Sequence, residues 1–254
     1  MQESKPMKEQ MHIAAQYLAA ANMSFLKKKE DDSHTNLGFD ISTLSLETYE
    51  LSPNEDKLSL HYNDFSLEWS SQKGNTKLSL DGKKHHAILE WLQELSKAHL
   101  SKEYMYEFHY DLPYSIEDIH MFTLTDPSEL DHLAHLRALA QNTIAHVVAS
   151  YHLDSPIRIW PHHFDTGAYA SLDDDSGISI GIGLAIPDSI SETHYFYISG
   201  YNDQGSFVPP SSEELSMGKW LDQDFKGAVL PATGLLESEA IQFFKEAIHQ
   251  YRIA

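Results

Sequence analysis

The sequence predicts an α+β protein with mostly antiparallel sheets and helices packed on one face. Runs of strand-like alternation are separated by runs of helical spacing, which is typical of this class. The chain shows no internal repeat, no low-complexity segment and no Pro/Gly/Ser-rich linker. Its 254 residues and 41% hydrophobic content suffice for one sizeable core. We therefore expect a single domain over residues 1–254, with lobes at 1–123 and 124–254.

The first half is predicted to begin with a helix over residues 6–23, where apolar residues fall near one face. Residues 39–81 alternate apolar and polar positions between turn signals, which predicts an antiparallel meander of three or four strands. Helical spacing returns over residues 84–100. The aromatic stretch "YMYEFHY" at 104–110 is predicted to form a further strand.

The second half opens with a strong helix start in "TDPSEL", and the helix should run to about Tyr151. Asp126 can cap it, Pro127 fits its first turn, and Glu129 can complete a capping box. Strands or short extended segments then follow at "PIRIW", "SGISIGIGLAIP", "HYFYISGY" and "GAVLP". The run "DDDSG" at 173–177 predicts a hairpin turn, "NDQGSFVPPSSEEL" predicts a loop, and residues 235–252 predict a closing helix.

Charge and cysteine content restrict the classes of function. The formal net charge is -20, so this acidic protein would repel nucleic acids and anionic membrane surfaces. The absence of cysteine excludes disulfides, iron–sulfur clusters, thiolate zinc sites and cysteine nucleophiles. The N-terminus lacks the continuous apolar segment of a signal peptide, and no run of 18 apolar residues could cross a membrane. We expect a soluble, cytoplasmic protein.

Three motifs carry a resemblance to a known family. The segments "SPIRIWPHHFD", "HYFYISGYN" and "GKW…FKGAVLP" resemble a bacterial family of uncharacterised proteins over roughly residues 126–250. The resemblance is looser in the first half, at "LSLDGKKHHAILEWL". It implies no catalytic residue, because the family has no established activity. Other members carry Glu-Pro where this chain has Thr193-His194, so any site that includes that glutamate would be altered here.

The segment "WPHHFD" at 160–165 contains the main candidate site. If it is a strand, alternation places His163 and Asp165 on one face. Imidazole and carboxylate are common ligands of divalent metals, so the pair could hold a metal with a third donor. The candidate ligands of such a divalent metal are His163 and Asp165, with His194, Glu192 or His109 as the third donor. The alternatives are a hydrogen-bonded His–Asp pair that supports the fold and a nucleophilic triad, but the chain lacks a G-x-S-x-G motif.

Three functions remain open. The first is a small-molecule-binding protein with a polar site at the end of the "WPHHFD" strand, because tyrosine and tryptophan supply apolar area with a polar tip. Its candidate ligand-binding residues are Trp160, His163, Asp165, Tyr195, Tyr197 and Trp220. The second is a metal-dependent hydrolase that uses His163 and Asp165. The third is a structural or interaction protein in which this segment only maintains the fold.

Overall fold

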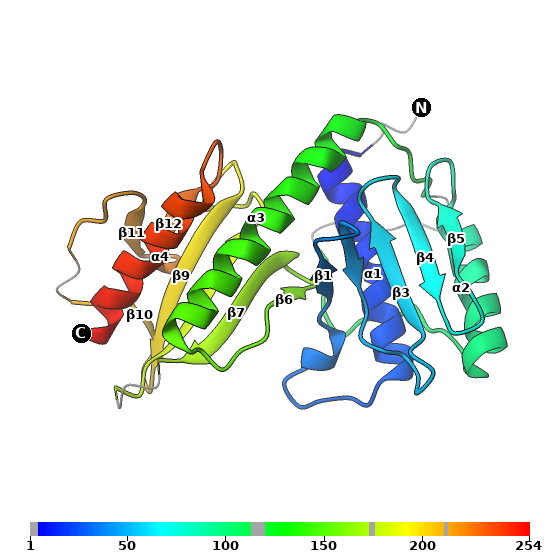
Figure 1. The fold of residues 1–254 in the computed structure, drawn as a ribbon, viewed down its shortest axis with the longest axis horizontal. Helices are drawn as coiled ribbons and strands as arrows, with labels where there is room; N and C mark the ends of the chain where they lie inside the picture. The colour runs from blue at the N-terminus through cyan, green and yellow to red at the C-terminus, as the bar shows by residue number, and fades with distance from the viewer. Residues whose placement is uncertain (1–4, 113–119, 173–175, 211–212) are drawn as a thin grey trace. The chain divides into compact units, whose positions relative to one another are not determined.

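The computed structural model describes residues 5–112, 120–172, 176–210 and 213–254 (Figure 1). This described part contains four α-helices and two antiparallel sheets, which confirms the α+β class. The chain divides into two compact units. The first holds the chain up to His135 together with Ile159–His162, and the second holds Leu136–Arg158 and the chain from His163 onward. The division therefore falls inside helix α3 (Pro127–Tyr151), later than the lobe boundary expected at 123/124.

The strands of the first unit form one antiparallel meander. They are β1 (Gly38–Asp40), β2 (Ser45–Glu47), β3 (Lys57–His61), β4 (Ser66–Ser70) and β5 (Thr76–Ser79), hydrogen-bonded in that order. Leu60 pairs with Leu67 and Leu58 with Trp69, so these four side chains share a face, and all are fully buried. The alternation in the sequence thus predicted the meander, with one strand more than expected.

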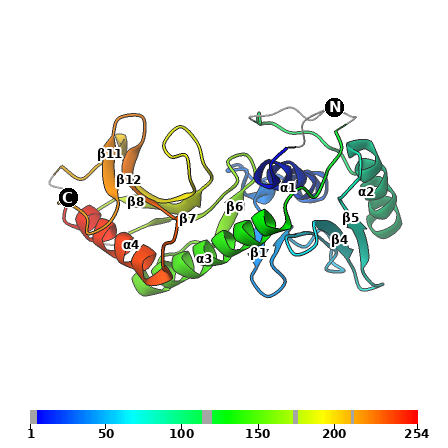
Figure 2. The same ribbon diagram turned by 90° about the horizontal axis from the view of Figure 1, so that it is seen from above.

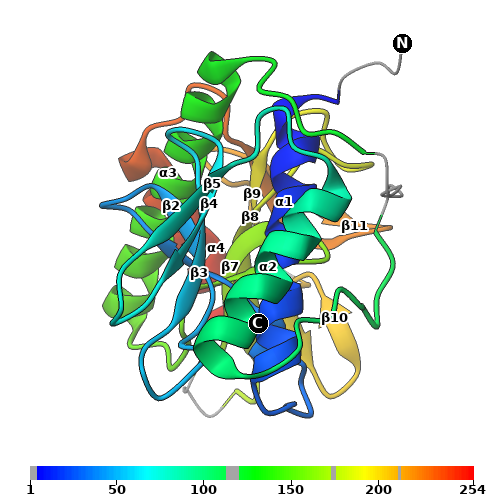
Figure 3. The ribbon, with the colours of Figure 1, turned by 90° about the vertical axis from the view of Figure 1, so that its right-hand side faces the viewer.

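Helices α1 (Met7–Phe25) and α2 (His85–Leu100) lie on one face of this sheet (Figure 3). Alanine, the strongest helix former, recurs through α1, and the helix is buried on nearly all sides. Several polar side chains of α1 are buried with the apolar ones: Gln10, His12, Gln16 and Asn22. Buried polar groups need partners, and those of α1 bind other segments of the first unit, as described below.

The prediction of a strand at residues 104–110 is wrong, although its alternation is real. The segment is extended, with Tyr104 buried, Tyr106 and Phe108 half-buried and the residues between them exposed. Its rings pack against helix α1, where the ring centroids of Tyr17 and Tyr106 are 5.3 Å apart. The Tyr104 hydroxyl donates to the Tyr17 carbonyl at 3.0 Å. A period of two therefore marks an extended segment here, not a member of a sheet.

The second sheet follows the order β11-β12-β9-β8-β7-β6, with β10 paired to β9 (Figure 1). Its strands are β6 (Arg158–Trp160), β7 (Asp165–Ser171), β8 (Ser179–Ala185), β9 (Tyr195–Asn202), β10 (Gly205–Phe207), β11 (Lys219–Asp222) and β12 (Lys226–Pro231). The division between the units passes through β6. The sequence did not predict β7 or β11, and β10 lies in a stretch expected to be a loop. The expected "DDDSG" turn falls on residues 173–175, which lie outside the described residues.

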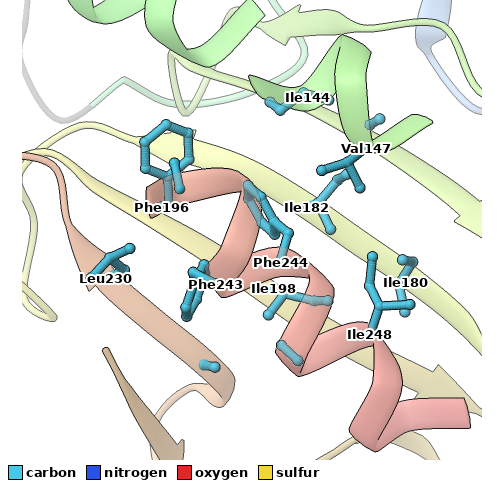
Figure 4. Packing of buried hydrophobic residues seen from close by; sticks show 14 of the residues in the cluster. Ile144, Val147, Ile180, Ile182, Phe196, Ile198, Leu230, Phe243, Phe244 and Ile248 are labelled. Atoms are coloured by element: carbon cyan, nitrogen blue, oxygen red, sulfur yellow. The ribbon is translucent and has the colours of Figure 1, made fainter. Parts of the chain in front are cut away.

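One face of the second sheet holds the core of its unit. Helix α4 (Glu237–Arg252) and the part of α3 from Leu136 onward cover this face (Figure 2). Ile180, Ile182 and Ile198 point toward Phe244 and Ile248 of α4 (Figure 4). Alternation along β8 and β9 therefore leaves glycine, serine and tyrosine on the opposite face.

The start of helix α3 has the expected cap at Asp126, but Glu129 has different hydrogen-bond partners from those expected. The Asp126 carboxylate accepts the backbone N–H of Ser128 at 2.9 Å and that of Glu129 at 3.3 Å. The Glu129 carboxylate, expected to close a capping box, instead accepts the N–H groups of Met7 and Lys8, each at 3.1 Å. It therefore satisfies unpaired donors at the N-terminus of α1. Among the described helices, none has the length and apolar character to cross a bilayer.

Candidate functional site

A polar pocket of about 320 Å³ lies in the first unit. Three separate segments contribute its lining residues, which are Asp31, Asp32, Thr35, Asn36, His109, Tyr110, Trp160 and His162. Trp160 and His162 of the "WPHHFD" motif therefore line a pocket, whereas His163, Asp165, Tyr195, Tyr197 and Trp220 are not among its described lining residues. The other lining residues come from the segment 31–36, which follows α1, and from the aromatic segment 104–110.

The buried side chain of Gln16 joins two walls of the pocket. Its amide nitrogen donates to the Pro161 carbonyl at 2.8 Å, between Trp160 and His162. Its amide oxygen accepts the Tyr110 hydroxyl at 2.8 Å. His12, one turn earlier on α1, also contacts the Pro161 carbonyl through Nε2 at 2.8 Å. Since a carbonyl can only accept, this imidazole nitrogen carries the proton.

A second set of contacts holds the remaining wall. The Asn22 amide on α1 donates to the Asn36 carbonyl at 3.1 Å. The backbones of Leu37 and Ile159 exchange two hydrogen bonds of 2.9 Å, which fixes the segment of Asn36 beside that of Trp160. Three buried polar side chains of α1 thus position all three segments that line the pocket.

Asp32 is the most unusual charged group of the pocket. Its backbone is left-handed, with φ 53°, where the chain turns into the short 3₁₀ helix Ser33–Thr35. Its Oδ2 lies 3.2 Å from Nε2 of His109. Its Oδ1 is shielded from solvent and has no hydrogen-bond donor among the described residues, since the exposed Lys28 ammonium is 3.8 Å away. Asp32 therefore brings to the pocket a carboxylate that lies beside His109 and, at a longer distance, beside Lys28.

The neighbouring groups add a second carboxylate and aromatic walls. The Ser33 backbone N–H donates to Asp31, which lowers the pKa of this carboxyl and keeps it ionised at neutral pH. The ring centroids of Tyr110 and His162 are 5.5 Å apart, and Trp160 is half-buried beside them. Burial raises the pKa of Tyr110 far above neutral pH, so its hydroxyl remains a donor to Gln16.

The second half of the motif has a different structure from the one expected. Residues 161–164 form a turn, so "WPHHFD" is not a continuous strand, and the alternation assumed for His163 and Asp165 does not apply. Phe164 has a left-handed backbone, with φ 62°. Arg137, buried on α3, donates to the Phe164 carbonyl at 2.5 Å and to the Thr166 hydroxyl at 2.6 Å. Its guanidinium also lies 4.2 Å from the centre of the Phe164 ring.

Asp165 begins strand β7 as a buried carboxyl. Its Oδ2 accepts the Tyr197 hydroxyl at 2.5 Å, and its Oδ1 is buried without a partner among the described residues. Burial raises the pKa of Asp165, while the Tyr197 hydrogen bond and the charge of the exposed His163 oppose that rise. The same burial and the nearby Asp165 raise the pKa of Tyr197, which therefore stays protonated as the donor.

The other candidate residues divide between two faces of the second sheet. Tyr195 and Tyr197 alternate with inward-facing residues of β9 and lie on the open face, where Tyr195 donates to Asp188 at 2.8 Å. Trp220 pairs with Ala228, which in turn pairs with Ile198, so it lies on the face that the helices cover. Its ring is 5.6 Å from that of Tyr251 on α4. The expectation that Trp220 shares a site wall with Tyr195 and Tyr197 is therefore wrong.

The expected metal site finds no third ligand in the described part of the chain. His194 lies just before β9, and its carbonyl accepts the Ala232 N–H at 2.8 Å. Across residues 5–112, 120–172, 176–210 and 213–254, no group of three His, Asp or Glu side chains is placed to hold a metal ion. His163 and Asp165 thus have no described partner for the coordination that the hydrolase hypothesis requires.

Several residues of the pocket were missed from the sequence. The signal for Gln16 and Asn22 was present, because a polar residue deep inside an alanine-rich, buried helix needs a partner. Asp31 and Asp32 lie in a run of charged residues that follows α1, and only the tertiary structure brings them near Trp160. Comparisons of the chain with protein-family models, with curated proteins and with solved structures found no match.

Proposed function

We propose that this protein binds a small molecule in the pocket of residues 31–36, 109–110 and 160–162, without converting it. The observation that carries the proposal is the combination of aromatic walls with polar groups around one pocket that is open to solvent. Trp160, Tyr110 and His162 offer ring surfaces, while Asp31 and Asp32 offer oxygen acceptors. This is the usual composition of a ligand site.

The size of the pocket limits the ligand. Pockets for drug-sized molecules typically span about 300–1,000 Å³, and this one, at about 320 Å³, is at the lower end. A molecule with one ring and a short chain is therefore the expected size class.

The hydrogen bonds behind the pocket support binding over a purely structural role. The buried side chains of Gln16 and His12 both hydrogen-bond to the Pro161 carbonyl, and Gln16 also accepts the Tyr110 hydroxyl. Walls that are fixed before the ligand arrives lose less conformational entropy on binding. The second half of the motif fits a structural role better, because Arg137 and Tyr197 already hold Phe164 and Asp165.

The test is a screen of ring-bearing amines, phenols and carboxylic acids by ligand-observed NMR. Wild type is compared with Trp160→Leu, which removes a wall of the pocket, and with Trp220→Leu as the matched control. Trp220 is also half-buried, packs against Tyr251 and is not among the residues that line the pocket. We expect compounds that bind wild type and Trp220→Leu, and that bind Trp160→Leu at least about tenfold more weakly, a loss of about 1.4 kcal/mol.

Two results would count against the proposal. If no compound binds wild type, or if the compounds bind Trp160→Leu as tightly as wild type, the pocket is not a ligand site. Far-UV circular dichroism and a melting curve of each variant show whether the variant is folded. A folded Trp160→Leu variant with unchanged binding would favour the alternative that "WPHHFD" only maintains the fold.

A further inference from the structure

We propose that the ligand of this pocket is an organic cation, a protonated amine carried on a small ring. The inference rests on the binding function proposed above and names the class of molecule. The observation behind it is that the carboxylates of Asp31 and Asp32 line the same pocket as the rings of Tyr110, Trp160 and His162.

A cation is the charge complement of the two carboxylates in the lining. The Asp31 carboxylate accepts the Ser33 N–H at 3.1 Å, and Oδ2 of Asp32 lies 3.2 Å from Nε2 of His109. Oδ1 of Asp32 lies 3.8 Å from the Lys28 ammonium, on a side chain that is 74% exposed. Because water screens an exposed ion pair, an ammonium held in the pocket would be a stronger charge partner for these carboxylates than Lys28 is.

The charges that line the pocket favour the same class. Its lining includes the carboxylates of Asp31 and Asp32, and none of the lining residues in the described part of the chain is lysine or arginine. A carboxylate or phosphate ligand would meet like charge without a fixed cation to balance it. The whole protein, with a net charge of -20, also attracts small cations toward its surface.

The aromatic walls suit a ring joined to a cation. An ammonium within about 6 Å of an aromatic ring face is attracted by the ring's quadrupole, most strongly for tryptophan. A ring of the ligand can also pack against the indole of Trp160 or the phenol of Tyr110. The pocket thus offers a charge partner at Asp32 and ring surfaces close to it.

Three probes that differ only in the end group test the class by isothermal titration calorimetry. They are tyramine, para-ethylphenol and para-hydroxyphenylpropionate, which end in a cation, a neutral methyl group and an anion. We expect tyramine to bind at least about tenfold more tightly than the neutral probe, and the anion to bind most weakly. The same phenol ring in all three holds the stacking contribution constant.

Asp32→Asn separates the charge from the shape. Asparagine tolerates the left-handed backbone of Asp32 as well as aspartate does, so the turn should survive. Asp40→Asn is the control, because Asp40 is likewise an aspartate in a turn, where it accepts the Ser42 N–H at 2.7 Å, and it does not line the pocket. We expect Asp32→Asn to weaken tyramine about tenfold, to leave para-ethylphenol within about twofold, and Asp40→Asn to change neither.

The outcomes separate the two proposals. If the neutral or anionic probe binds as tightly as tyramine, or if none of the three binds, the cation class is wrong. Binding of any other compound that depends on Trp160 would then still support the pocket as a ligand site. If Asp32→Asn fails to fold, Asp31→Asn replaces it, and the order of the three probes on wild type still decides.

Discussion

Asp165 is a buried carboxyl, and its ionisation lowers the stability of the folded protein. Burial raises its pKa, so the folded protein binds a proton more strongly at this residue than the unfolded chain does. Stability therefore falls as the pH rises from the unfolded value, about 3.9, through the raised folded value, and stays lower above it. Each unit by which the pKa is raised corresponds to about 1.4 kcal/mol of unfolding free energy lost at neutral pH.

Asp165→Asn should remove this dependence. The amide oxygen can still accept the Tyr197 hydroxyl, and the side chain no longer has to ionise in a buried place. We expect the variant's unfolding free energy, relative to wild type, to increase by about 1 kcal/mol or more between pH 4 and pH 7. Urea unfolding at a series of pH values measures the difference.

Asp188→Asn is the control for that measurement. Asp188 also accepts a tyrosine hydroxyl, that of Tyr195 at 2.8 Å, but its side chain is exposed. Its substitution should give a flatter difference over the same pH range, because water already solvates the carboxylate. A difference for Asp165→Asn that is flat or declines with pH would show that burial does not dominate at this residue.

At the scale of single residues, one of the six ligand-binding residues expected from the sequence, Trp160, lines the proposed pocket. The sequence could point to Trp160, because an aromatic residue beside a proline and two histidines is an unusual pattern. Asp32 gave no such cue, and the polar position of Gln16 in α1 indicates a partner without saying which, since both residues act through contacts far along the chain. Arg137 was also missed, and it explains why the motif turns at residues 161–164: its guanidinium holds the Phe164 carbonyl at 2.5 Å.

At the scale of elements, the glycines of β8 make room for tyrosine rings on the open face of the second sheet. A Cβ at Gly183 would lie 2.7 Å from the Tyr197 ring and 2.7 Å from the Thr166 carbonyl oxygen. At Gly181, the nearest atom to a Cβ would be 3.6 Å away, on Tyr201. Two glycines of one strand thus differ in whether a side chain fits.

Gly183→Ala should therefore destabilise the protein where Gly181→Ala does not. The added methyl group at Gly183 must displace a backbone carbonyl or the Tyr197 ring, at a cost of about 1–3 kcal/mol. At Gly181 the methyl group meets ordinary contacts, and reduced freedom of the unfolded chain should stabilise by up to about 1 kcal/mol. Chemical unfolding of both variants measures the contrast, and equal effects would contradict this account of the close packing.

The sequence predicted well those helices and strands whose hydrophobic period agrees with the burial of their faces. Helices α1, α2 and α4, and the strands of the first sheet, carry patterns that both propensity and burial support. The segment at 104–110 has the period of a strand, but its partner is a helix, and a local pattern does not contain that information. The short strands β10 and β11 have too few residues to show any period.

At the scale of the whole molecule, the excess of acidic residues acts on stability as well as on ligand choice. The net charge of -20 means that carboxylates repel one another, and this repulsion is stronger in the compact state than in the expanded chain. Dissolved salt screens this repulsion, and the screening length falls from about 10 Å at 0.1 M to about 3 Å at 1 M. Raising the sodium chloride concentration over this range at pH 7.5 should therefore raise the melting temperature by a few degrees.

The same titration at pH 5.0 distinguishes screening from a general salt effect. The sequence pI is about 5.0, so the net charge and its self-repulsion are near zero at that pH. Salt should then shift the melting temperature little, or lower it slightly by weakening attractive ion pairs such as Lys77 with Asp64 at 2.6 Å. An equal rise at both pH values would point to salt acting on apolar burial, and a fall at pH 7.5 would mean that attractive pairs outweigh the excess charge.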